Sequence, residues 1–275
     1  MYPSFSVSMC VYGGDEPAFF DAALRSIVDQ TVPPSEIVLV VDGPILEAIQ
    51  SVIVKWKMNL TEIAFRVIYL EQNMGHGEAR RISFENCSHD LIALMDADDL
   101  SVSTRFEQQL AYLDKHPEVS VVGGQIHEFI GDPSNCVGKR VVPLTDEDIR
   151  QYMQKRCPMN QVTVLFRKTD VAEVGGYIDW YCEEDYYLWL RLALAGKQFG
   201  NVDENMVNVR VGEEMYQRRG GMRYFKSEAK LQRFMLQNHL ITVPRYVINV
   251  AVRLILQVLM PNRLRGWVFQ KFARE

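Results

Sequence analysis

The chain has 275 residues, 48% of them hydrophobic, and a formal net charge of -5. That length and apolar content suffice for one sizeable α/β domain with a large core. The acidic balance argues against nucleic acid as a partner, because neutralising phosphates requires a basic surface.

Short β-branched runs alternate with amphipathic segments over the first 125 residues, which predicts an α/β fold with a mostly parallel sheet flanked by helices. The expected strands are 5–11, 36–41, 64–68, 91–95 and 119–123. The expected helices are 17–29, 45–57, 78–86 and 103–116, the last capped by Ser103. Ligands bind at the carboxyl ends of strands in such sheets, so the loops at Tyr12, Asp42 and Asp96 should face one crevice.

The second half of the chain is less regular. An extended run is expected at 161–167, a helix at 186–195, a strand at 206–211 and a long helix at 224–238. We expect a catalytic domain over residues 1–242 and a separate helical tail over 243–275. The tail carries six basic residues and one acid, whereas the preceding 242 residues carry 24 basic and 34 acidic side chains.

The tail has the pattern of an in-plane amphipathic helix. Its apolar stretch is divided by Arg253 into pieces far shorter than the roughly 20 residues needed to cross a bilayer. Polar side chains recur every four residues, at Arg245, Asn249, Arg253 and Gln257, with apolar residues opposite. We therefore expect the tail to bind an anionic membrane surface. The alternative is a pair of helices that packs on the catalytic domain.

An acidic triplet, Asp96-Ala97-Asp98-Asp99, follows the apolar strand 91–95. Alternation along a strand places Asp96 and Asp98 on the same side, where they can share a hard divalent cation such as Mg²⁺ or Mn²⁺. The alternative is an acidic loop that caps the next helix.

A second acidic cluster lies at Glu183-Glu184-Asp185. Three neighbouring carboxylates raise one another's proton affinity, which suits a general base. The same residues would also be favoured as N-terminal acids of a helix, because its dipole attracts negative charge. Both interpretations remain open.

Several segments occur in a familiar order: 8–12, the strand-end acid in 40–43, 73–80, the triplet at 96–99 and 184–191. Together they resemble family 2 glycosyltransferases of the GT-A fold, especially bacterial enzymes that build capsule, exopolysaccharide or O-antigen. The resemblance covers roughly residues 5 to 225. It implies a GT-A-like fold, a nucleotide-sugar donor and a divalent cation.

The resemblance also implies a role for each matching position. The resemblance implies that Tyr12 stacks on the base, that Asp42 binds the base edge and that Arg80 lies close to the base. It implies that Asp96 contacts the ribose and that Arg218 and Arg219 lie over the diphosphate. The metal ligand is Asp98 and the catalytic base is Asp185, beside Glu184. Gly13 departs from the family pattern, since many relatives have Asn there. His76 is given no role.

The expected activity is inverting transfer of a sugar, with UDP-hexose as the likeliest donor and a lipid-linked saccharide as acceptor. The Gln-x-x-Arg-Trp signature of processive synthases is missing, which favours transfer of one sugar per encounter. A silent sugar-nucleotide-binding scaffold and a sugar-1-phosphate nucleotidyltransferase remain alternatives. We expect a cytoplasmic protein attached peripherally to the inner face of the cell membrane.

The five cysteines are widely scattered and lack metal-ligand spacing. We expect them to be reduced, buried and without a catalytic role.

Overall fold

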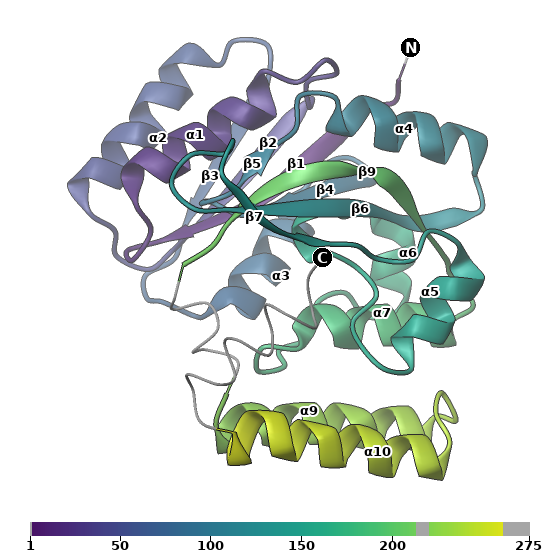
Figure 1. Ribbon diagram of the computed structural model, residues 1–275. Helices are drawn as coiled ribbons and strands as arrows, with labels where there is room; N and C mark the ends of the chain where they lie inside the picture. The colour runs from purple at the N-terminus through teal and green to yellow at the C-terminus, as the bar shows by residue number, and fades with distance from the viewer. Residues whose placement is uncertain (1, 213–219, 261–275) are drawn as a thin grey trace.

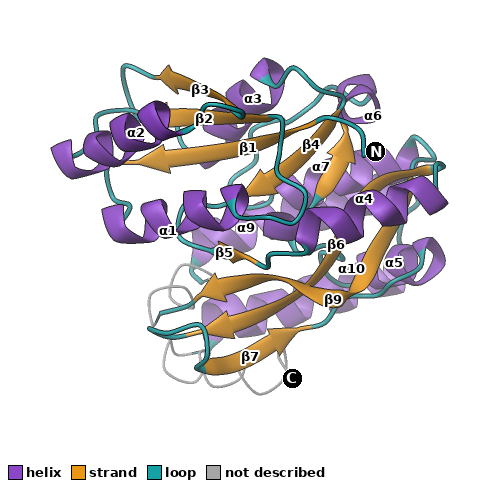
Figure 2. Ribbon diagram, turned by 90° about the horizontal axis from the view of Figure 1, so that it is seen from above, coloured by secondary structure: helices purple, strands orange, loops and turns teal. Residues whose placement is uncertain are grey.

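The computed structural model describes residues 2–212 and 220–260. One curled sheet runs through the molecule with helices on both faces (Figure 1). Seen from above, the sheet extends from β3 at one edge to the hairpin of β6 and β7 at the other (Figure 2). The predicted α/β class is confirmed.

The N-terminal half of the sheet is parallel, in the order β3-β2-β1-β4. Its strands are β1 (Phe5–Tyr12), β2 (Glu36–Asp42), β3 (Ala64–Tyr69) and β4 (Leu91–Met95). The helices between them are α1 (Pro17–Val28), α2 (Glu47–Asn59) and α3 (His76–Asn86). All seven were predicted to within two residues at each end, because their apolar residues follow the period of one secondary structure.

The other half of the sheet is mixed. Its strands are β5 (Leu100–Ser101), β6 (Val119–Phe129), β7 (Cys136–Arg140), β8 (Leu165–Arg167) and β9 (Gln198–Arg210). Strand β8 lies antiparallel between β4 and β6, whereas β6 and β9 are parallel. Residues 125–139 form mostly the β6–β7 hairpin. The expected extended run at 161–167 begins as a 3-10 turn, Gln161–Thr163.

Two apolar cores cover the two faces of the sheet. Helices α1, α2 and α4 (Arg105–Lys115) pack on one face, with Phe20, Ile49 and Phe106 fully or almost fully buried. The other face is covered by α3, α5 (Asp146–Met153), α6 (Lys168–Glu173) and α7 (Glu184–Leu194). Leu188 and Trp189 of α7 are completely buried there.

Two details of the sequence analysis are corrected. Helix α4 has Thr104 rather than Ser103 at its N-cap position, and no side chain caps it. All five cysteines are free thiols, but Cys136 and Cys182 are exposed. They lie in a surface strand and in a surface turn, where no apolar neighbours cover them.

A layer of two helices lies outside α7, formed by α9 (Met222–Gln237) and α10 (Val243–Leu254) (Figure 1). A short π-helix, η2 (Ile255–Leu259), continues α10. None of the helices in the described parts of the chain is long and apolar enough to span a membrane.

Candidate active site

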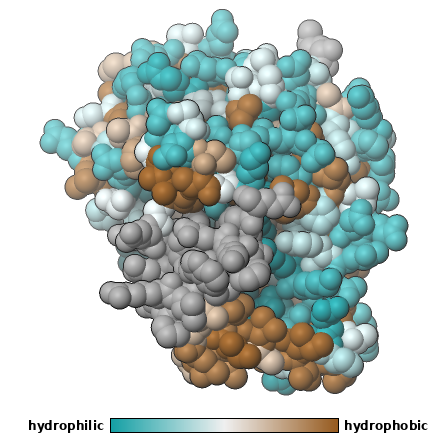
Figure 3. Space-filling model, viewed as in Figure 1, coloured by the Kyte–Doolittle hydropathy of each residue, from teal (hydrophilic) through white to brown (hydrophobic). Residues whose placement is uncertain are grey.

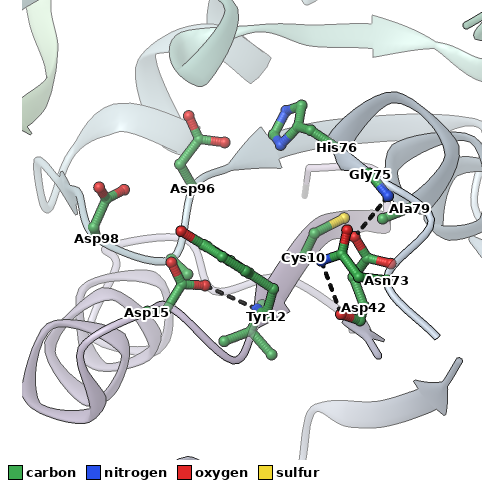
Figure 4. Close-up of a pocket in the computed structure, with 12 residues that line it drawn as sticks. Cys10, Tyr12, Asp15, Asp42, Asn73, Gly75, His76, Ala79, Asp96 and Asp98 are labelled. Atoms are coloured by element: carbon green, nitrogen blue, oxygen red, sulfur yellow. Dashed lines mark hydrogen bonds between the residues drawn. The ribbon is translucent and has the colours of Figure 1, made fainter. Parts of the chain in front are cut away.

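A pocket of about 420 Å³ opens at the carboxyl ends of β1, β2 and β4 (Figure 4). The three strands end side by side because β1 is paired in parallel with both β2 and β4. In this register Tyr12 lies opposite Asp42, and Met9 lies opposite Met95. The lining includes four residues that were expected at the site, Tyr12, Asp42, Asp96 and Asp98. The others were not expected there: Cys10, Val11, Asp15, Asn73, Gly75, His76, Ala79 and Ala97.

Asp42 ends β2 and is almost completely buried. Its Oδ1 accepts a hydrogen bond of 2.6 Å from the backbone nitrogen of Met74, and its Oδ2 accepts one of 3.1 Å from that of Gly75. The carboxylate therefore fixes the loop that leads into α3. Each oxygen has a second lone pair, so the same group can accept a further donor from a ligand.

Tyr12 is part of the pocket wall rather than of the core, since it is 42% exposed. Its ring lies against Gly14, where an added Cβ would come within 2.6 Å of the phenol oxygen. The backbone nitrogen of Tyr12 donates to Oδ2 of Asp15 at 2.9 Å (Figure 4). This turn leaves an aromatic face open to the pocket, where a planar base could stack.

Arg80 is fully buried and does not line the pocket. Its Nη2 lies 2.5 Å from Oδ1 of Asp96, and its Nη1 donates to the carbonyl of Ser8 at 3.3 Å. The resemblance implied a place near the base. In the structure Arg80 lies beneath the pocket, where it holds Asp96 at the pocket wall.

The acidic triplet separates into two kinds of side chain. Asp96 and Asp98 both line the pocket, as alternation predicted, and Asp98 is exposed (Figure 4). Asp99 is buried, and its Oδ1 accepts from the backbone nitrogen of Arg210 at 2.8 Å. Burial, followed by the charges of Asp98 and Asp96, raises the pKa of Asp99. Asp99 thus anchors the acidic loop to β9.

Within residues 2–212 and 220–260, no group of three or more His, Cys, Asp and Glu side chains is placed to hold a metal ion. The pocket nevertheless offers carboxylate oxygens, the ligands that hard divalent cations prefer. A cation held by one or two carboxylates takes its remaining ligands from water and substrate phosphates. The donor set around Asp98 fits that arrangement.

The second acidic cluster opens α7, as expected for N-terminal acids of a helix. Burial, together with the neighbouring charge of Asp185, raises the pKa of Glu184 to about 7. Glu183 is also buried, and its pKa is raised by burial and by the charge of Glu228. Asp185 is only partly buried, so it is the most accessible of the three carboxylates.

His76 connects this cluster with the pocket. Its Nε2 lies 3.9 Å from Oε1 of Glu184 and 3.4 Å from Nη2 of Arg80. A Cβ at Gly77 would lie 3.8 Å from Cβ of Glu184, so the first turns of α3 and α7 are in contact. The imidazole is half exposed, and the desolvation of its covered part together with the charge of Arg80 lowers the pKa of His76.

His76 and Asp15 are site residues that the sequence analysis did not assign. A detectable signal for His76 was its place between two glycines at a predicted helix start, which allows close approach by another element. Asp15 carried no such signal. Arg218 and Arg219, expected over the diphosphate, lie outside the described residues.

Comparison with known proteins supports the resemblance. The sequence model described as Glycosyl transferase family 2 matches residues 6–171. The chain is 34% identical over 272 residues to a UDP-Gal:alpha-D-GlcNAc-diphosphoundecaprenol beta-1,3-galactosyltransferase of Escherichia coli, covering 99% of this chain and 97% of that one. It is also 34% identical to the amylovoran biosynthesis glycosyltransferase AmsE of Erwinia amylovora, covering 97% and 98%.

Solved structures share the fold at low sequence identity. TarS of S. aureus (residues 1–349) in complex with UDP-GlcNAc has a TM-score of 0.67 at 16% identity, covering 92% of this chain and 73% of that one. The mannosyltransferase PcManGT of Pyrobaculum calidifontis, with GDP-Man and Mn²⁺, has a TM-score of 0.65 at 14% identity, covering 99% and 80%. With a family match over more than half its length and full-length relatives at 34% identity, the chain belongs to glycosyl transferase family 2 and is a glycosyltransferase.

Proposed function

We propose that this glycosyltransferase moves a hexose from UDP-hexose onto a hydroxyl of a lipid-linked saccharide, with inversion at the anomeric carbon, in cell-surface polysaccharide biosynthesis. One observation carries the proposal: a pocket with an open aromatic ring and four carboxylates lies beside a second cluster that contains a partly buried carboxylate. The E. coli relative is named for a UDP-Gal donor and a diphosphoundecaprenol-linked GlcNAc acceptor.

The nucleoside would bind at the β1 and β2 side of the pocket. The exposed face of Tyr12 suits stacking on uracil, and Asp42 has lone pairs free to accept its imide N–H. Asp96, which Arg80 holds at the pocket wall, would accept hydrogen bonds from the ribose hydroxyls. We further propose that Arg218 and Arg219 bind the diphosphate, since guanidinium groups form paired hydrogen bonds with phosphate oxygens.

Asp98 would hold a divalent cation, Mg²⁺ or Mn²⁺, at the diphosphate side of the pocket. The cation, when bound, would neutralise charge on the departing diphosphate. The concentration of negative charge at the pocket supports the need for a cation. The pocket wall contains four aspartates, Asp15, Asp42, Asp96 and Asp98. A doubly charged diphosphate would otherwise be repelled from these carboxylates.

Asp185 would take the proton from the acceptor hydroxyl. Its carboxylate is mounted on the rigid first turn of α7 and remains partly exposed. Glu184 lies deeper and contacts His76, so it would act through Asp185 and the pocket wall rather than on the acceptor directly.

The test is a pair of variants assayed for UDP affinity and for transfer. Asp185→Asn should keep UDP affinity within about twofold while removing most transfer, because an amide cannot accept the proton. Asp98→Ala should abolish stimulation by Mn²⁺, and Asp203→Asn, an exposed acid on β9, is the matched control. Near wild-type transfer by Asp185→Asn, or full turnover in excess EDTA, would refute these assignments.

We also propose that the chain attaches peripherally to the inner face of the cell membrane through residues 243–275. The boundary of this tail falls at the start of α10, where Thr242 caps the helix by accepting from the backbone nitrogen of Arg245. The excess of basic residues in the tail and the lipid-linked acceptor of the E. coli relative support this proposal. Binding to anionic vesicles in a sedimentation assay is the direct test.

A further inference from the structure

The polar stripe of α10 faces the protein, which reverses the usual orientation of a surface helix. Asn249, Arg253 and Gln257 are all buried. Nδ2 of Asn249 donates to the carbonyl of Gln154 and to Oε1 of Gln232, each at 2.8 Å. The stripe predicted from the sequence is therefore present, but it contacts the catalytic domain.

An ion pair fixes this orientation. Nε of Arg253 lies 3.1 Å from Oε2 of Glu228 on α9, and Gln257 donates to the same oxygen. Nη2 of Arg253 also donates to the carbonyl of Lys155 at 3.1 Å. Rotating α10 to bury its apolar face would remove these partners from the largely buried carboxylate of Glu228, which opposes the rotation.

The opposite face of α10 and η2 is apolar and open to solvent. Its residues are 46% to 67% exposed and are all aliphatic: Val243, Val247, Ile248, Val252, Ile255 and Leu259. They form a continuous brown surface over α10 at the lower edge of the molecule (Figure 3). At 1.5 Å per residue, this face extends along roughly 25 Å of helix. Apolar patches of this kind mark surfaces that bind a partner or a membrane.

We infer that this face inserts into the headgroup boundary of an anionic membrane, so that α10 lies in the plane of the lipid with the catalytic domain above it. The inference rests on the proposed function, in which the acceptor is linked to a membrane lipid. It identifies the aliphatic face of α10 and η2 as the surface that contacts this membrane. It differs from electrostatic binding by a basic tail, because the aliphatic side chains themselves enter the lipid.

Charge identifies lipid rather than a second copy of the chain as the occupant. Residues 221–260 contain six basic side chains and one acid, Glu228, which is already paired with Arg253. Four of the basic side chains are exposed along α9: Arg223, Lys226, Lys230 and Arg233. A twofold dimer through α10 would bring two such basic helix pairs together, whereas anionic headgroups would neutralise them.

The experiment compares two charged double variants in the full-length chain. Val247→Glu/Val252→Glu places charges on the exposed face of α10, and Val54→Glu/Met58→Glu places the same charges on exposed positions of α2. Binding is measured by sedimentation with phosphatidylcholine vesicles, with and without phosphatidylglycerol. The α10 variant should lose vesicle binding by about tenfold or more, and the α2 variant should bind like the wild type. Circular dichroism checks that both remain folded.

The outcomes separate this inference from the proposed function. Both variants should transfer sugar to a water-soluble acceptor at the wild-type rate, because neither pair of positions lies at the pocket. If the wild type transfers sugar but never binds vesicles, the membrane surface is refuted and the proposed function stands. If light scattering shows a wild-type dimer that the α10 variant converts to monomer, the face is a contact between copies and the inference fails.

Discussion

The guanidinium of Arg80 donates to Asp96 across 2.5 Å while being completely buried beneath the pocket at the ends of β1, β2 and β4. An arginine that the family resemblance associates with the base thus acts here through a carboxylate on the neighbouring strand end. The pair joins α3 to the end of β4, and so it sets the position of the pocket wall.

Replacing Arg80 tests this relationship. Arg80→Met keeps most of the side-chain volume but leaves Asp96 without its partner, so we expect affinity for UDP to fall by about tenfold. Calorimetric titration with UDP measures the effect. Arg81→Met is the matched control, because Arg81 lies on the same helix and pairs only with Glu78 and Glu85 at the surface. Equal UDP affinity in the two variants would show that Arg80 does not position Asp96.

The raised pKa of Glu184 predicts a pH dependence of stability. Folding raises it from the usual 4.5 to about 7 because burial and the charge of Asp185 disfavour the charged form. The folded protein therefore binds this proton more tightly than the unfolded chain, and the associated stability is lost as the pH rises from about 4.5 through 7. Glu184→Gln should be more stable than the wild type at about pH 8, by about 2 kcal/mol.

Urea unfolding at about pH 5 and about pH 8 measures this effect, since the advantage of Glu184→Gln should shrink at the lower pH. Glu204→Gln, at an exposed position of β9, should show no such pH dependence relative to the wild type. A Glu184→Gln variant whose advantage is the same at both pH values would contradict the assignment of the shift to this carboxyl.

The Arg253–Glu228 pair should stabilise the packing of α10 on α9. Arg253→Ala leaves the largely buried carboxylate of Glu228 without its ion pair, and we expect the free energy of unfolding to fall by about 1–3 kcal/mol. Arg245→Ala, on the same helix, should cost less than about 0.5 kcal/mol. Adding Glu228→Gln to Arg253→Ala should cost less than the sum of the two single variants. Additive losses in this cycle would mean that the two side chains do not interact.

The departure at Gly13 has a steric explanation. A Cβ at this position would lie 2.6 Å from the carbonyl oxygen of Pro44, in the loop after β2. Gly13→Asn, which introduces the residue common in relatives, should therefore displace the loop next to Asp42 and lower the free energy of unfolding by about 1–3 kcal/mol. Thermal unfolding of this variant is compared with Gly212→Ala, where nothing lies within 4 Å of an added Cβ. Unchanged stability of Gly13→Asn would show that the loop yields without cost.

The pocket edge formed by β1, β2 and β4 could be predicted from the sequence. Each strand is a mostly apolar run that ends at or just before a polar residue, Tyr12, Asp42 or Asp96. Parallel strands end at the same edge of a sheet, so local patterns were enough to bring these three side chains together. The start of α7 at Glu184 could also be predicted from a local pattern, because clustered acids before an apolar helix favour a helix N-terminus.

The sequence by itself determined that Tyr12, Asp42 and Asp96 lie at the carboxyl ends of parallel strands, and that α10 has one polar and one aliphatic face. Only the tertiary structure decided that His76 meets Glu184, that Arg80 lies beneath the pocket and that the polar face of α10 is the buried one. Periodicity identifies the faces of a helix, but which face is covered depends on partners distant in the sequence. For α10 those partners are Gln232, which is fully buried and accepts from Asn249, and Glu228, which pairs with Arg253, so the polar stripe faces inward and the aliphatic face remains outside.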